Sequence, residues 1–428
     1  AMMSGDAIEA EWEERARVVF PAGGFGNFDP SITVSRGQGA RVWDETGKHY
    51  VDFLIGSGPL VLGHLNPEVV EAVQQQLEKG TTYFANNAKA IELAEEICQA
   101  VACAEQVRYV STGTEAVMYA IRLARAHTRR DKILKFEGGF HGMSSEGLMS
   151  LAPTRLENFP LAVPDSAGIP DNVRDNVLVA PFNDSAAATQ LIGEYGDDIA
   201  AVIVEPLQRL LLPEPDFLET LRVMTQERGI ILIFDEIVTG FRLAYGGAQE
   251  RYGVTPDLCT LGKIVGGGFP LAVVAGKTEL MAHFDKNLSA DTGFTFQNGT
   301  LSGNPIAAAA GLKTLEILRR PGSYQQLRTN GEQVMKAITE HLGFQQISHR
   351  IVGDPVMFDV VFTESSVKNY RDGLKGDGER SRRFNACLRE HNVLKLDTKF
   401  YISLALTEED LDLTGLSIRE AAQKLALA

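Results

Sequence analysis

The sequence has few cysteines and no long hydrophobic run, and each absence excludes a class of protein. Its four cysteines (Cys98, Cys103, Cys259 and Cys387) form neither the close pairs of a metal site nor a dense disulfide framework. We therefore expect small buried thiols in a reducing compartment and no metal site. No apolar run approaches the roughly 20 residues that span a bilayer. The first residues, AMMSGDAIEAEWEERARVV, are acidic and amphipathic, unlike a signal peptide.

Basic residues are also fewer than acidic residues. The 428 residues include 41 Lys and Arg against 56 Asp and Glu, which gives a formal net charge of −15. Because such a protein repels nucleic-acid backbones and anionic membranes, we expect neither as a partner. The 44% hydrophobic and 23% charged contents are those of an ordinary globular protein. Together these features predict a cytoplasmic protein with one large domain and a smaller one.

The most informative stretch runs from residue 229 to 268. Its first residues, Ile230 to Phe234, form a short β-branched run typical of a buried parallel strand, and Asp235 follows where open α/β sheets bind ligands. A second strand, 257–261, leads to Lys263 and a glycine cluster. A lysine amine and a carboxylate at two strand ends suit pyridoxal phosphate (PLP), which needs a Schiff-base lysine and an acid beside its ring nitrogen. Taken singly, Asp235 fits a turn carboxylate and Lys263 a surface charge equally well.

Strands alternate with helices over more than 150 residues, which predicts a mostly parallel α/β sheet. The character changes near residue 318, where helices and strands indicate a smaller α+β domain. We expect long loops at 150–176, which holds several prolines, and at 367–381, which is rich in charge. The expected division is an N-terminal segment 1–87 (part of the small domain and of an interface), a large domain 88–317 and a small domain 318–428.

A turn of small residues after the expected strand 106–110 is a candidate phosphate site. It reads STGTEA at 111–116 and leads into a helix. Free N–H groups and the positive end of a helix dipole attract a phosphate, and Thr112 and Thr114 add hydroxyl donors. An ordinary Ser/Thr helix cap is the alternative.

A second turn, after the expected strand 132–136, places Phe140 and His141 between glycines. An aromatic ring there is suited to stack on a flat cofactor. A turn with a core phenylalanine is the alternative.

Taken together and in order, these segments resemble the class III, fold-type-I PLP-dependent aminotransferases, in particular the branch that contains glutamate-1-semialdehyde 2,1-aminomutase. The matching motifs are PAGG at 21–24, GSGPLVLGH at 56–64, STGTEA at 111–116, FEGGFHG at 136–142, VEP at 204–206, FDEIVTGFR at 234–242, TLGKIVGGG at 260–268 and GTLSGNP at 299–305. The resemblance implies a large domain with a mostly parallel seven-stranded sheet, a smaller α+β domain, and a cytoplasmic homodimer with PLP at the interface.

The resemblance also implies roles for single residues. Lys263 is similar to the Schiff-base lysine and Asp235 to the partner of the ring nitrogen. The remaining expected cofactor contacts are Thr112, Gly113 and Thr114 (phosphate), Phe140 and His141 (ring), Glu205 (role open), Gln208 (ring hydroxyl) and Thr300 (phosphate of the neighbouring subunit). Arg209 is a candidate for a donor carboxylate or a plain surface cation.

The sequence departs from the aminomutase pattern in the loop after PAGG. Aminomutases of the family carry a carboxylate-binding arginine there, whereas this loop, 25–30, has Phe25 and Phe28 and no cation. We therefore expect a ping-pong aminotransferase that moves an amino group from a small donor to an aldehyde or ketone, similar to modules of natural-product assembly. The alternatives are a glutamate-1-semialdehyde 2,1-aminomutase and a non-catalytic PLP-binding protein. The intact Lys263 and Asp235 argue against the last of these.

Overall fold

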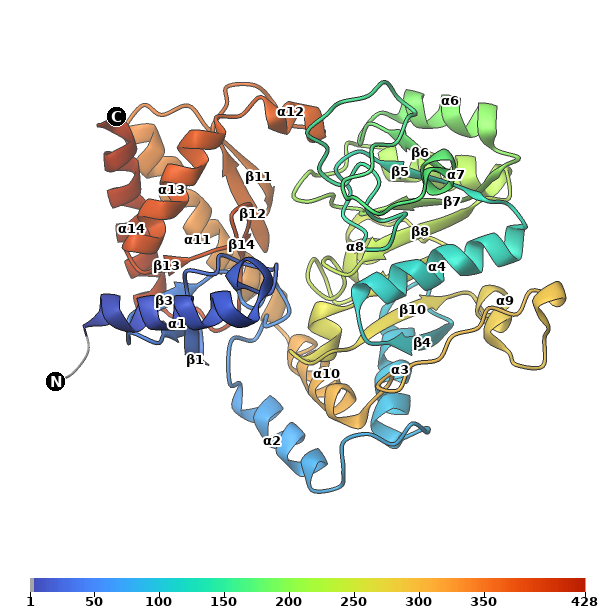
Figure 1. Ribbon diagram of the computed structural model, residues 1–428, viewed down its shortest axis with the longest axis horizontal. Helices are drawn as coiled ribbons and strands as arrows, with labels where there is room; N and C mark the ends of the chain where they lie inside the picture. The colour runs from blue at the N-terminus through green and yellow to red at the C-terminus, as the bar shows by residue number, and fades with distance from the viewer. Residues whose placement is uncertain (1–3, 428) are drawn as a thin grey trace.

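The structure, a computed structural model, describes residues 4–427 and is organised around a large seven-stranded sheet (Figure 1). Five neighbouring strands run parallel, whereas β10 is antiparallel to both of its neighbours. The strands in spatial order are β4 (Gln106–Val110), β10 (Ala272–Gly276), β9 (Leu258–Leu261), β8 (Ile231–Glu236), β7 (Ile199–Val204), β5 (Lys132–Phe136) and β6 (Val177–Ala180). This confirms the mostly parallel α/β sheet.

Helices cover both faces of the large sheet, which explains why its central strands are apolar throughout. Ile231 and Ile233 of β8 pack in the same cluster as α4 (Gly113–Thr128), whereas Leu232 and Phe234 pack in the cluster that contains α7 (Phe217–Glu227). Successive side chains of a strand point to opposite faces, so a strand buried on both sides has no polar alternation. The sheet is therefore rigid where its carboxyl ends carry polar residues.

Two small sheets lie beside the large one, and one of them joins the two ends of the chain (Figure 1). One contains β11 (Arg350–Asp354), β12 (Met357–Val361) and β14 (Phe400–Tyr401). The other contains β1 (Val34–Gln38), β2 (Arg41–Asp44), β3 (His49–Asp52) and β13 (Val393–Leu394). Because β13 pairs with β3, residues from the N-terminal segment and from the C-terminal region share one sheet. The division of the chain into an N-terminal segment 1–87, a large domain 88–317 and a small domain 318–428 stays a prediction.

Helices fill the spaces between and around the sheets, and one of them joins the two sides. Besides α4, α7 and the joining helix, these are α1 (Gly5–Val19), α2 (Pro67–Leu77), α3 (Ala88–Ala100), α5 (Asp171–Asp175), α6 (Ser185–Tyr195), α8 (Gly247–Tyr252), α9 (Thr278–Met281), α10 (Pro305–Leu318), α11 (Ser323–Phe344), α13 (Gly378–Glu390) and α14 (Glu408–Ala426). The joining helix, α12 (Tyr370–Leu374), reaches the large sheet through Arg371, whose Nε donates to Glu137 Oε1 at 2.9 Å (Figure 1). Within residues 4–427, no helix is long and apolar enough to cross a membrane.

The structure corrects three local expectations. The charged segment 367–381 is not a plain loop, because it contains α12 and the first turn of α13. Their N-caps are Asn369 and Asp377, whose side chains accept backbone N–H groups. Asp235 lies inside β8, not after it, since the strand continues to Glu236. The expected loop at 150–176 ends in the short helix α5.

Candidate active site

The carboxyl end of β8 places Asp235 at the bottom of a cavity of about 380 Å³. Its side chain is only 4% exposed, and Oδ2 lies 2.7 Å from His141 Nδ1. Oδ1 accepts hydrogen bonds from the Thr260 hydroxyl and the Ile237 N–H, both at 3.1 Å. These three contacts fix the orientation of the carboxylate. His141 does not line the cavity, so within this chain it is a positioning residue that acts through Asp235.

Lys263 lies on the other side of the same cavity, at the first residue of a short 3₁₀ turn, Lys263–Gly266. Its φ of 51° is left-handed, which is strained for a residue with a side chain and fixes the direction of the amine. Burial lowers the pKa of Lys263, and the positive charges of Lys399 and Arg242 lower it further, against the opposing effects of Tyr401 and Asp235. A lowered pKa increases the fraction of neutral amine, which is the nucleophilic form.

The Lys263 amine is held by a loop more than 200 residues earlier in the chain. Nζ donates to the carbonyl oxygen of Ser57 at 2.9 Å, and the neighbouring Gly58 carbonyl accepts from the buried Arg242 guanidinium. Gly58 has a φ of 106°, and a Cβ there would lie 2.8 Å from Arg242 Nη2 and 2.9 Å from the Tyr401 ring. Only glycine fits this approach, which accounts for the GSGP segment.

In the turn before α4, one threonine caps the helix and the other is free to contact a phosphate. Thr112 is the N-cap, and its hydroxyl exchanges hydrogen bonds with Glu115 in a capping box, so the side chain serves the helix. Glu115 also accepts the N–H groups of Ser111 and Thr112. In residues 4–427, the N–H groups of Gly113 and Thr114 have no such acceptor, and Thr114 Oγ1 accepts from Met143 N, which leaves its own proton free to donate.

These groups meet the requirements of a phosphate site at the cavity wall. Ser111, Gly113 and Thr114 line the cavity, and a Cβ on Gly142 would lie 2.8 Å from Thr114, so glycine keeps the neighbouring loop close. Two free N–H groups and a hydroxyl at a helix N-terminus suit a phosphate. Together with the amine of Lys263 and the carboxylate of Asp235, this donor set fits PLP. Ser111 was not among the residues that the sequence indicated.

Phe140 and Glu205 form the wall beyond Asp235. Phe140 is 43% exposed and lines the cavity, and its backbone N–H donates to Glu205 Oε1 at 2.6 Å. Burial raises the pKa of Glu205, and Asp235 raises it further, although His141, Lys399 and the Phe140 N–H act in the opposite direction. Gln208 lies behind this wall, in a second cavity of about 430 Å³, and its Nε2 donates to the Glu137 carbonyl at 2.9 Å.

Three other residues that the sequence singled out lie outside this cavity. Thr300 is exposed between β10 and α10 and does not line the cavity of its own chain. Phe25 and Phe28 lie beside α1 and Leu54, in a separate surface groove. The structure instead adds Lys399 and Tyr401 to the cavity lining. No role in the site was predicted for either residue, because Lys399 immediately precedes β14 and Tyr401 ends it, far along the sequence from Lys263.

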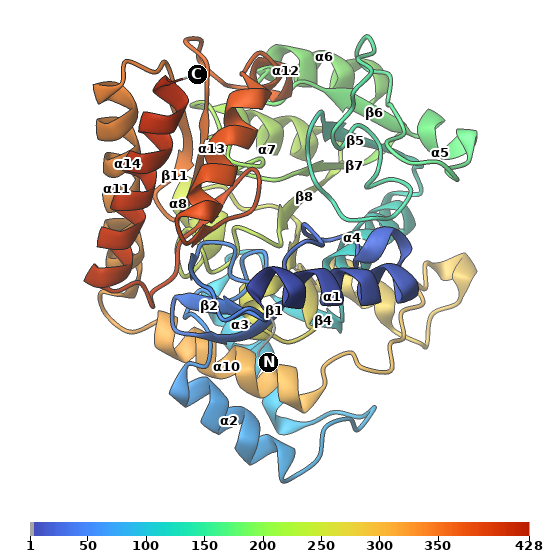
Figure 2. The same ribbon diagram turned by 60° about the vertical axis from the view of Figure 1, so that its left-hand side comes forward.

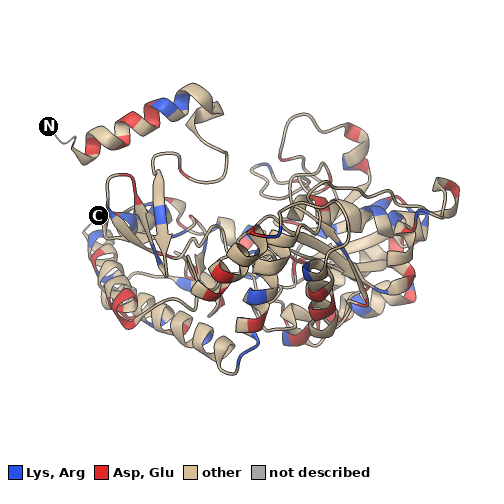
Figure 3. Cartoon of the chain, turned by 90° about the horizontal axis from the view of Figure 1, so that it is seen from below, with Lys and Arg blue, Asp and Glu red and all other residues tan. Residues whose placement is uncertain are grey.

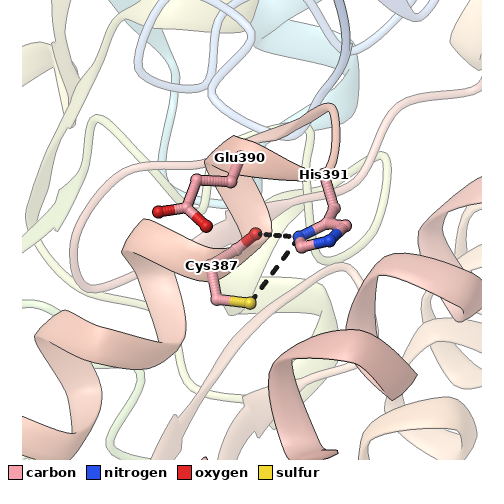
Figure 4. A group of neighbouring side chains, drawn as sticks. All are labelled: Cys387, Glu390 and His391. Carbon is pink, nitrogen blue, oxygen red and sulfur yellow. Dashed lines mark hydrogen bonds between the residues drawn. The ribbon is translucent and has the colours of Figure 1, made fainter. Parts of the chain in front are cut away.

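Cys387, Glu390 and His391 lie together at the end of α13 (Figure 4). Their existing contacts do not favour a metal. Glu390 pairs with Lys424 at 2.7 Å, and His391 Nδ1 lies 2.8 Å from the Cys387 carbonyl oxygen. We assign no metal site to this cluster.

The fold and the Lys263–Asp235 cavity define a fold-type-I, PLP-dependent enzyme, and comparison with known proteins agrees. The chain matches the class III aminotransferase family over residues 26–403 and belongs to that family. It is 40% identical to glutamate-1-semialdehyde 2,1-aminomutase 2 of Brevibacillus brevis over 399 residues, which are 92% of this chain and 91% of the relative.

Solved structures give the same assignment. An omega-transaminase from Sphaerobacter thermophilus matches with a TM-score of 0.91 and 33% identity, covering 97% of both chains. A beta-phenylalanine aminotransferase from Variovorax paradoxus matches with a TM-score of 0.84 and 29% identity, covering 97% of this chain and 93% of that one. The family thus contains both transaminases and aminomutases among the relatives of this chain.

Proposed function

We propose that this enzyme moves an amino group from an amino donor to a separate aldehyde or ketone in a ping-pong reaction. The observation that carries the proposal is the meeting of the Lys263 amine and the Asp235 carboxylate in one cavity of about 380 Å³. When bound, PLP supplies an electron sink for the bond that breaks next to the amine. Lys263 Nζ, with its lowered pKa, takes the proton from the donor carbon and returns a proton in the reverse direction to the acceptor.

Other residues of the cavity prepare this proton transfer. Asp235, oriented by His141 and Thr260, is placed to hold a proton on the ring nitrogen of the cofactor. The Gly113 and Thr114 N–H groups and the Thr114 hydroxyl are placed to bind the phosphate, and Phe140 to lie against the ring. We expect the enzyme to work in the cytoplasm, which is supported by four cysteines that are all free thiols.

An aminomutase of glutamate-1-semialdehyde is the second candidate, and the 40% identity to such an enzyme favours it. The loop 25–30 lacks the cation that the aminomutases of the family carry there, and this departure favours the transferase. We expect amine exchange between two different substrates to exceed the conversion of glutamate-1-semialdehyde to 5-aminolevulinate. The check is to measure both rates on the same holoenzyme. A mutase rate that matches the best donor–acceptor pair would contradict the proposal.

The proposed active unit is a homodimer. Several large apolar side chains are exposed on one chain, among them Phe25 (78%), Phe84 (67%) and Phe296 (62%). Helix α1 contributes no buried residue and lies at the outside of the chain (Figures 2 and 3). Large apolar side chains that are exposed in one chain are candidates for burial in a subunit interface. A second copy that covers it accounts for an exposed Thr300 next to Phe296 and Leu301.

Thr300→Ala tests the proposed contact of Thr300 with the phosphate of the partner subunit. We expect PLP binding to weaken by about 1–2 kcal/mol, the loss of one charge-assisted hydrogen bond. Titration of apoenzyme with PLP measures the change, and Thr255→Ala, at another exposed threonine, is the matched control. A monomeric variant that binds PLP as tightly as the parent would show that the partner contributes nothing.

A further inference from the structure

Two cations face the active-site cavity without an acidic partner. Lys399 is only 7% exposed, and the contact of its Nζ is the Tyr401 hydroxyl at 3.3 Å. Arg209 lines the same cavity, with its guanidinium carbon 5.5 Å from the centre of the Phe140 ring. Within residues 4–427, neither cation has a carboxylate oxygen within 4 Å. The two come from different elements, one next to β14 and the other after β7.

An unpaired buried ammonium is unfavourable, so Lys399 requires an explanation. Other buried cations of the chain have polar partners. Lys395 lies 3.3 Å from the Asp359 carboxylate, Lys135 donates to the Gly139 carbonyl at 3.1 Å, and Arg242 donates to two carbonyls. The Lys399 amine, in contrast, contacts only one residue, Tyr401, through the hydroxyl and through the ring, whose centre lies 5.3 Å from Nζ, among the residues that the structure describes. The missing partner is therefore expected to be a ligand.

Backbone strain holds Arg209 in place. Gln208 and Leu211 exchange two backbone hydrogen bonds, at 3.0 and 2.9 Å, around a two-residue turn made of Arg209 and Leu210. Both turn residues are left-handed, with φ values of 46° and 81°. Such turns favour Asn and Gly, so the backbone is strained at these two bulky residues. Strained backbone conformations are frequent at functional sites. Here the turn places the Arg209 guanidinium at the cavity wall.

The acids of the cavity do not neutralise these cations. Asp235 is engaged by His141, and Glu205 accepts the Phe140 N–H with a pKa that burial raises. The effect reaches Tyr401: burial raises its pKa, but the charges of Lys399, Lys263 and Arg242 outweigh burial and leave the pKa lowered. This side of the cavity therefore has an excess of positive potential, which favours an additional anion.

We propose that Lys399 and Arg209 together bind the carboxylate of the amino donor, which is therefore an amino acid and not a simple amine. The proposal deepens the aminotransferase function and rests on it for the role of the ligand as donor. The carboxylate is then bound by the residue just before β14 and by the turn after β7, and not by the cation-free loop 25–30. The cofactor phosphate has its own donors at Gly113 and Thr114, so the Lys399–Arg209 pair is available to the substrate.

A binding experiment tests the anion site without any turnover. The probe is 3-phenylpropionate, an unreactive carboxylate, with neutral 3-phenylpropanamide as its matched partner, titrated into holoenzyme by calorimetry. We expect Lys399→Met and Arg209→Met each to weaken carboxylate binding about 10- to 100-fold, the effect of losing a charge-assisted hydrogen bond. Binding of the amide should not change. Lys399→Arg, which keeps the charge, should retain most of the affinity, and Lys368→Met at the exposed surface is the control.

Kinetics separate failure of this inference from failure of the proposed function. Amino acids and their decarboxylated amines are compared in the first half-reaction, followed by the absorbance of the cofactor. Lys399→Met and Arg209→Met should raise KM for the acids alone. An equal rise in KM for acids and amines would overturn the carboxylate site, and so would equal affinity of the enzyme for 3-phenylpropionate and 3-phenylpropanamide. Variants that lose PLP but still bind the carboxylate would overturn it as well. If wild-type enzyme binds the carboxylate but transfers no amine, the function fails and the anion site stands.

Discussion

Lys263→Ala is expected to abolish turnover while leaving a folded protein that still binds PLP without a covalent bond. Within residues 4–427, no second amine lies in the same position, because Lys399 is held at Tyr401 and Lys135 is fully buried against backbone carbonyls. Removing the Lys263 side chain removes both the nucleophile and the proton carrier. The phosphate donors of Gly113 and Thr114 are unaffected, so the cofactor retains much of its binding.

The variant is checked by amine transfer and by borohydride reduction followed by mass analysis of the intact protein. Wild-type enzyme should gain the mass of a reduced PLP adduct, and the variant should not. Lys286→Ala, at an exposed lysine, should behave as wild type and controls for the loss of a positive charge. A covalent adduct that persists in Lys263→Ala would place the attachment on another lysine.

The parts of the site that the sequence predicts are those encoded locally. Lys263 and Asp235 each follow a short apolar run that cannot be solvent-exposed, and the end of such a strand fixes where the next side chains lie. The family motifs around them are continuous stretches of sequence. The fold class follows for the same reason, because alternating strands and helices admit few arrangements.

The parts that the sequence does not predict depend on contacts between distant residues. The Ser57 carbonyl meets Lys263 across 206 positions, and Arg242 meets Gly58 across 184. Lys399 enters the cavity only because β14 pairs with β12, which leaves the preceding residue at the site. The reversal of β10 is another such case, since an isolated apolar run does not encode its direction.

The sequence leaves two roles open for the Thr112 hydroxyl. A threonine before a helix serves as a cap or as a phosphate ligand, and the sequence fits both roles. The deciding residue is Glu115, three positions later, whose carboxylate completes a capping box with Thr112. The S/T-x-x-E spacing was present in the sequence and favours the cap for the Thr112 hydroxyl. The phosphate site that we propose therefore depends on Thr114 and on backbone N–H groups.

Asp235→Asn is expected to preserve the fold and to lower kcat by several orders of magnitude. The amide is nearly the same size as the carboxylate, and its oxygen can still accept from Thr260 and Ile237. The amide N–H₂ would then face His141 Nδ1, which can accept it when the proton of the ring sits on the buried Nε2. What is lost is the negative charge, and without it nothing holds a proton on the ring nitrogen of the cofactor, so the electron sink weakens.

Glu236→Gln is the matched control for this result, because the two acids are adjacent in β8 and point to opposite faces. Glu236 accepts from Thr239, Ala248 and Gln249, and burial raises its pKa despite these contacts. Its loss should lower thermal stability with little effect on kcat per folded molecule. Asp235→Asn should show the reverse, a large loss of kcat with a melting temperature close to that of wild type. A near-wild-type kcat in Asp235→Asn would remove Asp235 from the chemistry, whereas a collapse of stability would make it a residue of the core.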